Sequence, residues 1–394
     1  MPGRPSVVGR EFRRSPGLCR ITVLMRSLVA GAGVNPADQN WAWWPLLPLY
    51  PFGQRRTLRR ELVPGQIWSF EQLQGVFFVA VPIRMTAVKL KAGLLLYAPV
   101  AATAECIGLV RELEAEHGPV LSIVHPTSSG LEHKVGVPAM ARAFPQAEVW
   151  VTPGQWSFPL PLPLSWLGFP SRRTRVLFED GLPHQDELCW GQLGPVPLGP
   201  GPFCEATLLH QVSGSLLCTD GLIAVSGRWP ELLDLDPKPL LYHGRNDGRE
   251  PMDDCLERRL RGWKRLVLFA TCLKPHAVEQ VWRPYPFRWK PGWEADFDAI
   301  SRGAQLRVAP ILEDLVFPRH RPLMTQWLRH CAELPVQRLV PAHFEAPIDC
   351  DSAQFLALAE AWEQQDQPQA EQLDRSFLRA FNRQIERLGL VPKV

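Results

Sequence analysis

The stretch VLSIVHPTSSGLEHKVGVPAMARAFPQAEVWVTPG, residues 120–154, decides which fold this chain can adopt. It begins with an apolar run, residues 120–124, that predicts a buried strand ending at His125. A polar loop leads to a helix-like segment at residues 137–144, and a second apolar strand follows at residues 148–151. A strand, a helix and a strand in this order form a βαβ unit, which favours a parallel strand pair within an α/β layer.

Segments on both sides of this unit carry further strand and helix signals. Apolar or alternating runs before it predict an antiparallel opening sheet and then a helix, at residues 66–72, 77–90, 93–100 and 103–116. After it, the runs EATLLHQ (205–211) and SLLCTDGLIAV (215–225) predict a hairpin. We also expect a helix around residues 323–334 and a short strand at Leu339 and Val340.

The sequence divides into four parts. They are a disordered basic segment (1–39), an aromatic and basic extended arm (40–65), a main domain (66–350) and a C-terminal amphipathic helical segment (351–394), interrupted near Pro368. The main domain contains two insertions rich in Pro and Trp, at about 153–200 and 228–303. The first insertion predicts irregular structure. The second predicts helical pieces, among them a helix from Asp253 that runs into a strand near Val267.

The composition is that of an ordinary globular protein and argues against several classes of function. Of 394 residues, 46% are hydrophobic and 21% are charged. A formal net charge of +3 gives no general basic signature, so we expect no nucleic-acid partner. The nine cysteines include no CxxC pair, which favours a reducing, cytoplasmic setting over a disulfide framework. No apolar run approaches the ~20 residues of a membrane span, and a signal peptide fits the N-terminus poorly.

The arm, NWAWWPLLPLYPFGQRRTLRREL from Asn40 onward, combines aromatic and basic side chains. In one interpretation it lies extended in a groove of the main domain, with its aromatic rings as the contact. In the other it makes a peripheral contact with an anionic membrane surface. The residues for that membrane contact would be Trp41, Trp43, Trp44, Arg55 and Arg56.

Side chains that can bind a metal ion stand at four predicted strand ends. They are His125 with Glu132 and His133 in the loop of the βαβ unit, His210, Asp220 and His343. Imidazole and carboxylate groups on loops over a sheet are the ligands that zinc, iron and manganese use. Each one also has an ordinary interpretation, such as a histidine bonded to backbone or a turn-forming aspartate. We expect a metal site from the joint pattern, which carries more weight than any single member.

These elements together resemble the metallo-β-lactamase superfamily, in which a strand ends in a His-x-His-x-Asp-His loop followed by a helix. His125 resembles the first histidine of that loop, Glu132 stands in the place of its aspartate, and His133 resembles its last histidine. A later superfamily element runs from a Gly-His-Thr-Pro-Gly-Ser segment through a strand to Gly-Asp. His210 and Asp220 resemble its histidine and its aspartate.

His343, within Pro341-Ala342-His343-Phe344, resembles the closing histidine of the superfamily. The resemblance implies an αββα sandwich, in which two facing mixed sheets are flanked by helices. More narrowly, the chain is similar to an uncharacterised group from photosynthetic organisms, a domain of unknown function, over roughly residues 41–350. The stretches that carry this similarity are the PLLPLYPFGQRRTLRREL arm, the RMTAVKLKAGLLLYAPV hairpin and the GLEHKVGVPAMARAFPQAEVWVTPG segment.

Two departures from the superfamily pattern affect the expected site. No histidine stands where the second one of the loop would be, and Glu132 replaces the aspartate. The resemblance therefore implies a mononuclear or rearranged site built from His133, His210, Asp220 and His343. Zinc is the metal it implies first, with iron or manganese as alternatives.

The function that the resemblance implies is that of a metal-dependent hydrolase. A metal-bound hydroxide would attack an unknown small molecule with an ester, thioester or phosphodiester-like bond. Glu132 would serve as the catalytic proton acceptor, as a weak ligand, or as a residue that supports the ligands without touching the metal. The alternative is a non-catalytic member of the fold that acts as a scaffold or at a membrane surface, which the incomplete first loop and the aromatic arm favour. A di-iron redox function needs more ligands than the sequence offers.

Overall fold

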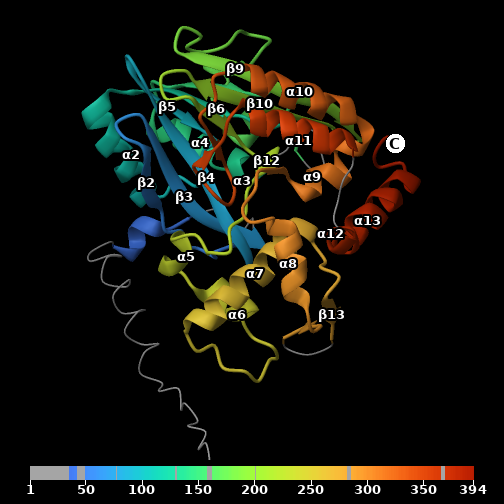
Figure 1. Cartoon of the computed structure of the whole chain (residues 1–394). Coiled ribbons are helices and arrows are strands. Elements are labelled where there is room, and N and C mark those ends of the chain that lie inside the picture. The colour runs from blue at the N-terminus through green and yellow to red at the C-terminus, as the bar shows by residue number, and fades with distance from the viewer. Residues whose placement is uncertain are drawn as a thin grey trace, which may run out of the picture.

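The computed structural model describes most of the chain. The described ranges are 35–41, 49–76, 78–128, 131–157, 162–199, 201–281, 285–364 and 369–394. Two β-sheets face each other in it, and helices cover their outer faces (Figure 1). Three buried apolar clusters lie between these four layers. The α/β class and the αββα sandwich are therefore confirmed.

The first sheet has eight strands. They are β1 (Leu49–Tyr50), β2 (Leu58–Val63), β3 (Ile67–Val76), β4 (Val79–Leu90), β5 (Gly93–Tyr97), β6 (Val120–His125), β7 (Glu148–Val151) and β8 (Thr174–Val176). Strands β3, β4 and β5 pair in antiparallel fashion, as the opening sheet was expected to do. Strands β5 to β8 are parallel. The predicted βαβ unit is therefore present, with its second strand at the expected residues.

The second sheet has five strands. In chain order they are β9 (Leu188–Leu198), β10 (Gly201–His210), β11 (Ser215–Cys218), β16 (Arg338–Pro341) and β17 (Ile348–Asp349). Strands β10 and β11 form the predicted hairpin, and β11 pairs in parallel with β16. Two small pairs lie outside the sheets, β12 (Leu222–Ile223) with β15 (Arg307–Val308), and β13 (Val278–Gln280) with β14 (Phe287–Trp289).

Helices on each outer face bury one apolar side against the sheet. The first sheet is covered by α2 (Ala104–His117) and α4 (Val137–Ala143), and the second by α10 (Arg321–Glu333) and α11 (Ser352–Gln364). Thr103 begins α2 because its hydroxyl accepts a hydrogen bond from the amide of Cys106. Shorter helical segments are η1 (Pro36–Gln39), α3 (Leu131–Lys134), η2 (Leu164–Leu167), α9 (Pro310–Leu315) and η3 (Phe317–Arg319).

The two insertions are more regular than the sequence predicted. The segment 153–200, expected to be irregular, contains β8 and the long edge strand β9. An edge strand tolerates Pro195 and Pro197 because one side of its backbone has no strand partner. In the second insertion, the helix expected to become a strand near Val267 continues as α7 (Leu256–Cys272). Its last turns are buried on every side, so their apolar run resembles a buried strand.

The helices of the second insertion form a separate group against the ends of β3 and β4. They are α5 (Leu232–Leu235), α6 (Lys238–His243), α7 and α8 (Trp293–Ser301), and they lie together in the lower part of Figure 1. Leu73 and Ala80 of the two strands belong to the same apolar cluster as these helices. Phe344, which directly follows His343, belongs to it as well, so this group supports one wall of the expected site.

The arm makes its contacts inside the domain. Trp41 is 5% exposed, and the Arg55 guanidinium, fully buried, lies 4.0 Å from the centre of the Trp41 ring. Arg56 pairs with Glu105 of α2. Trp41 and Arg55 therefore do not offer a surface to a membrane. Trp43 and Trp44 lie outside the described residues. None of the helices in the described ranges has the length and apolar character that a membrane crossing requires.

Candidate metal centre

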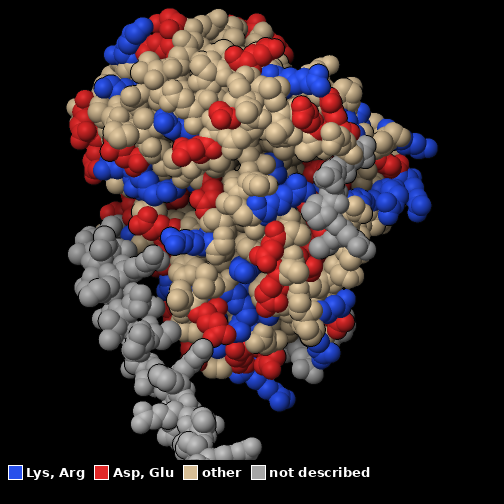
Figure 2. All heavy atoms as spheres, in the orientation of Figure 1, with Lys and Arg blue, Asp and Glu red and all other residues tan. Residues whose placement is uncertain are grey.

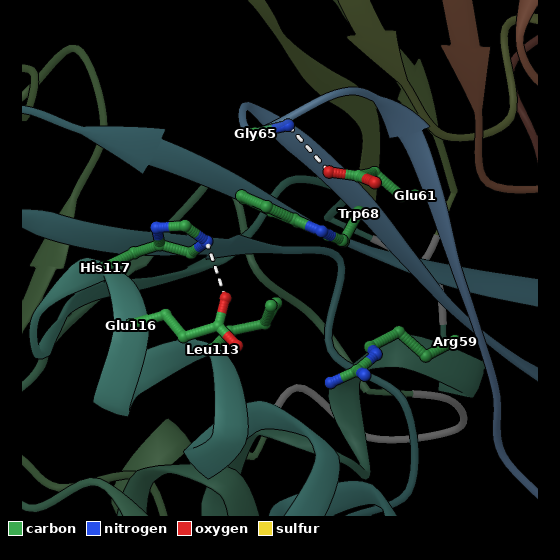
Figure 3. Close-up of a pocket in the computed structure, with 7 residues that line it drawn as sticks. All are labelled: Arg59, Glu61, Gly65, Trp68, Leu113, Glu116 and His117. Carbon is green, nitrogen blue, oxygen red and sulfur yellow. Dashed lines mark hydrogen bonds and ion pairs between the residues drawn. The ribbon is translucent and has the colours of Figure 1, made fainter.

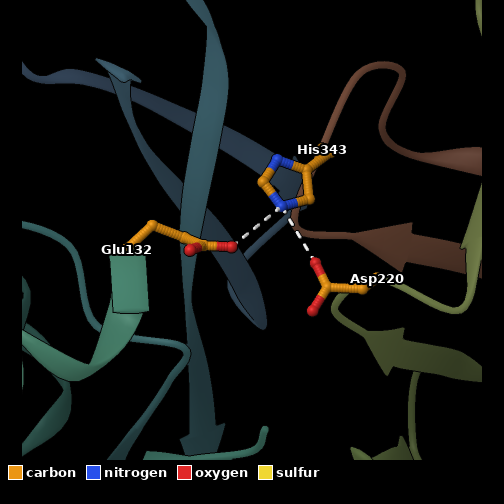
Figure 4. Close-up of side chains that lie close together, drawn as sticks. All are labelled: Glu132, Asp220 and His343. Atoms are coloured by element: carbon orange, nitrogen blue, oxygen red, sulfur yellow. Dashed lines mark hydrogen bonds and ion pairs between the residues drawn. The ribbon is translucent and has the colours of Figure 1, made fainter. Parts of the chain in front are cut away.

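Three loops bring Glu132, Asp220 and His343 together (Figure 4). One ligand atom from each side chain lies within 4.8 Å of the other two. Glu132 is in α3, which follows β6, while Asp220 and His343 each stand two residues after the parallel strands β11 and β16. The carboxyl ends of parallel strands lie at one edge of a sheet, so the two loops of the second sheet start side by side.

The loop after β6 crosses from the first sheet to the second, which explains how Glu132 reaches this edge. Thr127 forms an isolated bridge with Glu205 of β10. The amide of Ser128 donates to the carbonyl of Cys204, and the amide of Cys204 donates to the Ser128 hydroxyl. These bonds fasten the loop to β10 and so bring α3, which follows the loop, to the second sheet.

His343 is held between a backbone carbonyl and two carboxylates. Its Nε2 lies 3.1 Å from Asp220 Oδ1 and 4.0 Å from Glu132 Oε1, as the dashed lines of Figure 4 mark. Its Nδ1 lies 3.3 Å from the carbonyl oxygen of Pro82. Burial lowers the pKa of the imidazole, but the neighbouring Asp220 carboxylate outweighs it and raises that pKa overall. Burial conversely raises the pKa of Asp220, and the two histidines lower it overall.

His133 is fully buried, and its ring centre lies 6.1 Å from that of His343. Its Nδ1 is 3.2 Å from the carbonyl oxygen of Pro99. A carbonyl only accepts, so Nδ1 carries the proton, and in the neutral ring Nε2 carries the lone pair. Burial favours this neutral form because it lowers the pKa of the ring.

Both histidines therefore fit a metal ion. The Nε2 atom of His133 is buried and has no hydrogen-bond partner among the described residues. A backbone carbonyl on Nδ1 is the usual orientation of a histidine that binds a metal through Nε2. Two imidazoles and two carboxylates also suit zinc, iron or manganese by donor type. The group whose ligand atoms lie within 4.8 Å of one another comprises Glu132, Asp220 and His343, and His133 lies next to it as a further possible ligand.

Two buried residues with ionisable side chains, which the sequence did not single out, hold the ligand loops, and burial raises the pKa of one of them, Glu205, to about 7. The carboxylate of Glu205 accepts hydrogen bonds from the amides of Thr219, Asp220 and Gly221. The guanidinium of Arg84 donates to the carbonyls of Pro341 and Phe344, on either side of His343. Glu205 and Arg84 lie inside apolar strands, where an unpaired charge would be costly. That placement is the one sequence signal that could have identified them.

The remaining predicted ligands lie elsewhere. His210 is at the turn end of β10, where its Nδ1 lies 2.8 Å from the hydroxyl of Ser213. Five residues of strand, roughly 16 Å at 3.3 Å per residue, separate it from Glu205 beside Asp220. His125 is fully buried, with its ring centre 6.5 Å from that of Phe169. The structure brings neither histidine into the group of Figure 4.

A surface hollow lies at the opposite end of the first sheet, near the turn between β2 and β3 (Figure 3). The rings of Trp68 and His117 stack there with centres 4.7 Å apart. The other lining residues are Arg59, Glu61, Gly65, Leu113 and Glu116. Glu132, Asp220 and His343 are not among the residues that line this hollow, so the hollow is not part of the metal site.

Comparison with solved structures finds metallo-beta-lactamases at low identity. The enzyme from Pontibacter korlensis is 13% identical, with a TM-score of 0.35, over 77% of this chain and 99% of that chain. The enzyme from Erythrobacter litoralis is 13% identical, with a TM-score of 0.34, over 78% and 96%. The enzyme from Hirschia baltica is 11% identical, with a TM-score of 0.36, over 78% and 97%.

Among curated proteins, none matches this chain. A family model described as a domain of unknown function, DUF4336, matches residues 64–361. The matched range runs from the turn before β3 into α11, so it contains both sheets except β1 and β2, together with all three ligand loops. The expected relationship to a domain of unknown function is confirmed, and the chain belongs to the DUF4336 family.

Proposed function

We propose that this chain is a mononuclear metal-dependent hydrolase, with His133, Asp220 and His343 as ligands and Glu132 beside them. The observation that carries the proposal is the buried, unpartnered Nε2 of His133, turned away from the carbonyl that fixes Nδ1. A bound divalent ion would supply Lewis acidity, which polarises a substrate carbonyl or phosphoryl group and makes water acidic near neutral pH.

The loop after β6 favours a single metal ion, because its polar side chains bind protein backbone and do not serve as further ligands. Ser128, in the middle of that loop, donates its hydroxyl to the carbonyl of Pro202 at 2.7 Å. The buried ammonium of Lys134 donates to the carbonyls of Ser128 and Trp156. These polar side chains hold backbone in place, so they are occupied with joining the sheets. A cation at Lys134 would also repel a second metal ion nearby.

The chain's own residues would handle the substrate and its proton. Glu132 has the most exposed side chain of the group, at 30%, while those of Asp220 and His343 are 20% and 16% exposed. Its carboxylate therefore lies towards the opening and is placed to take a proton from the attacking water. The fully buried His133 would keep bulk water from the inner side. This arrangement suits an ester, thioester or phosphodiester-like bond.

The first test is metal content by elemental analysis of the purified protein and two variants. We expect near-stoichiometric zinc, iron or manganese in the wild type and loss of that metal in Asp220→Ala. The matched control is His210→Ala, which removes a histidine that the sequence predicted as a ligand but that lies elsewhere in the fold. It should retain the metal. No metal in the wild type after reconstitution would contradict the proposal and favour the non-catalytic alternative.

Glu132→Gln separates catalysis from metal binding. The amide keeps the size of the side chain but cannot take a proton, so we expect hydrolysis to slow by about 10²–10⁴-fold while most of the metal remains bound. Rates would be measured on chromogenic carboxylic ester, thioester and phosphodiester substrates with protein of known metal content. A variant as active as the wild type would exclude Glu132 as the proton acceptor.

A further inference from the structure

The C-terminal helix α13 (Ser376–Arg387) lies at the outer edge of the molecule, next to the described C-terminus (Figure 1). Its inner side is fixed, because Leu378 is fully buried and Asn382 bonds to Arg319 of the body. Just before the helix, the buried guanidinium of Arg375 pairs with Asp314 and with Glu313 of α9. The preceding short helix α12 (Gln369–Asp374) joins the same network through Glu371. The helix is therefore held in one orientation.

The outer side of α13 exposes large apolar side chains along one line. Phe377 and Phe381 are 37% and 39% exposed, and their rings stack with centres 6.3 Å apart. Leu388 directly after the helix and Leu390 beyond it are 64% and 54% exposed. Residues four and seven positions apart lie on one face of a helix, so Phe377, Phe381 and Leu388 share a face.

Exposed basic side chains occur in the same segment as this apolar line. Arg383, Arg387 and Lys393 are all exposed. Glu386, the one acidic side chain in residues 376–394, pairs with Arg319 at 3.1 Å, so its charge is compensated within the protein. Figure 2 shows Lys and Arg atoms gathered at the edge where α13 lies in Figure 1. The exposed face of α13 thus combines apolar rings with positive charge.

We propose that this face, with the residues that follow it, docks on an anionic lipid surface. A helix with Phe and Leu on one face and Arg or Lys beside them lies in the plane of a lipid interface, with its apolar side among the acyl chains. The cations beside it lie at the depth of the headgroups and are attracted by anionic lipids. The uncompensated charges of this segment are positive, which matches a layer of anionic lipid headgroups. This proposal is independent of the metal centre.

The test is cosedimentation of the full chain with phosphatidylcholine vesicles, with and without phosphatidylglycerol. We expect binding to the anionic vesicles that weakens as salt is raised. The double variant Phe377→Ser/Phe381→Ser should bind at least about tenfold more weakly, because it loses both aromatic side chains of the exposed face. The matched control is Leu356→Ser, which replaces a residue of α11 that is 47% exposed, and it should bind like the wild type.

A second pair of variants tests the charge. Arg383→Gln/Arg387→Gln should reduce binding to anionic vesicles, whereas Arg111→Gln on the exposed side of α2 should not. Circular dichroism would verify that all variants are folded. Wild-type protein that binds neither vesicle would overturn the proposal. So would a phenylalanine double variant that still binds like the wild type. Self-association abolished by that variant, without vesicle binding, would identify a second copy of the chain as the occupant instead.

Discussion

Arg84→Met is expected to lower the free energy of unfolding by about 3 kcal/mol and to release the loop that carries His343. Arg84 and Glu71 form an ion pair in which both side chains are 1% exposed. Burial raises the pKa of Glu71, but the guanidinium groups of Arg84 and Arg60 lower it overall, so Glu71 is charged in the folded state. Removing Arg84 leaves that buried charge with the partly exposed Arg60 as its one remaining cation.

The same substitution removes two donors to the backbone on either side of His343. The carbonyls of Pro341 and Phe344 would lose their partners, and the imidazole between them would lose its fixed position. We therefore expect about 10–100-fold weaker metal binding, measured by titration of metal-free protein, beside a urea unfolding curve. The control is Arg265→Met, which also removes a buried arginine that donates to backbone carbonyls, those of His243 and Arg245. It should lose stability but keep its metal affinity. Equal metal affinity in the two variants would show that Arg84 has no part in positioning His343.

Local patterns in the sequence were enough to predict most of the fold. The βαβ unit was predictable because an apolar run, a polar loop and an amphipathic segment follow one another without a break at residues 120–151. The β10–β11 hairpin was predictable because its turn is short, and β16 because its apolar residues end at Pro341. Each of these elements depends on residues that are close together in the sequence. Hydrophobic periodicity and turn residues are local patterns, so they can predict such elements.

Strand direction explains why His210 lies apart from the other predicted ligands. His210 and Asp220 both follow apolar runs, so the sequence places both at the ends of strands. In an antiparallel hairpin, however, the end of the first strand lies beside the start of the second. His210 therefore pairs with Ser215 at the turn, and Asp220 lies at the other edge. Consecutive strands of a hairpin cannot place both of their carboxyl ends at one site. Applied to the predicted hairpin, that rule would have excluded either His210 or Asp220 from the predicted set of metal ligands.

Residues that support the site were less predictable because their partners are distant in the sequence. Arg84 contacts the backbone some 260 positions later, and nothing near it in the chain indicates that contact. Glu205 lies inside an apolar strand, but the residues next to it in the sequence do not indicate that its partners are the amides of Thr219, Asp220 and Gly221. A buried charge inside a strand is costly without partners, but the sequence alone does not show which charges are buried.

Glu205→Gln is expected to disorder the loop of Asp220, although it changes the size of the side chain very little. One carboxylate oxygen of Glu205 accepts from the amide of Thr219, and the other accepts from the amides of Asp220 and Gly221. A glutamine has one oxygen that accepts and one amino group that only donates. At least one backbone amide would then face another donor in a fully buried position. An unsatisfied buried group costs about 1–3 kcal/mol, and the loop would move to avoid that cost.

We expect Glu205→Gln to bind metal at least about tenfold more weakly because Asp220 would lose its fixed position beside His343. Calorimetric titration of metal-free protein measures the affinity, and thermal unfolding of the same sample measures the stability. The control is Glu105→Gln, whose wild-type carboxylate likewise accepts from a backbone amide, that of Thr57, in a partly buried place on α2. That control should lose some stability and retain its metal. If both glutamine variants bound metal like the wild type, the three hydrogen bonds that Glu205 accepts from backbone amides would stabilise the fold without positioning the ligand. Asp220 would then be held by His343 without them.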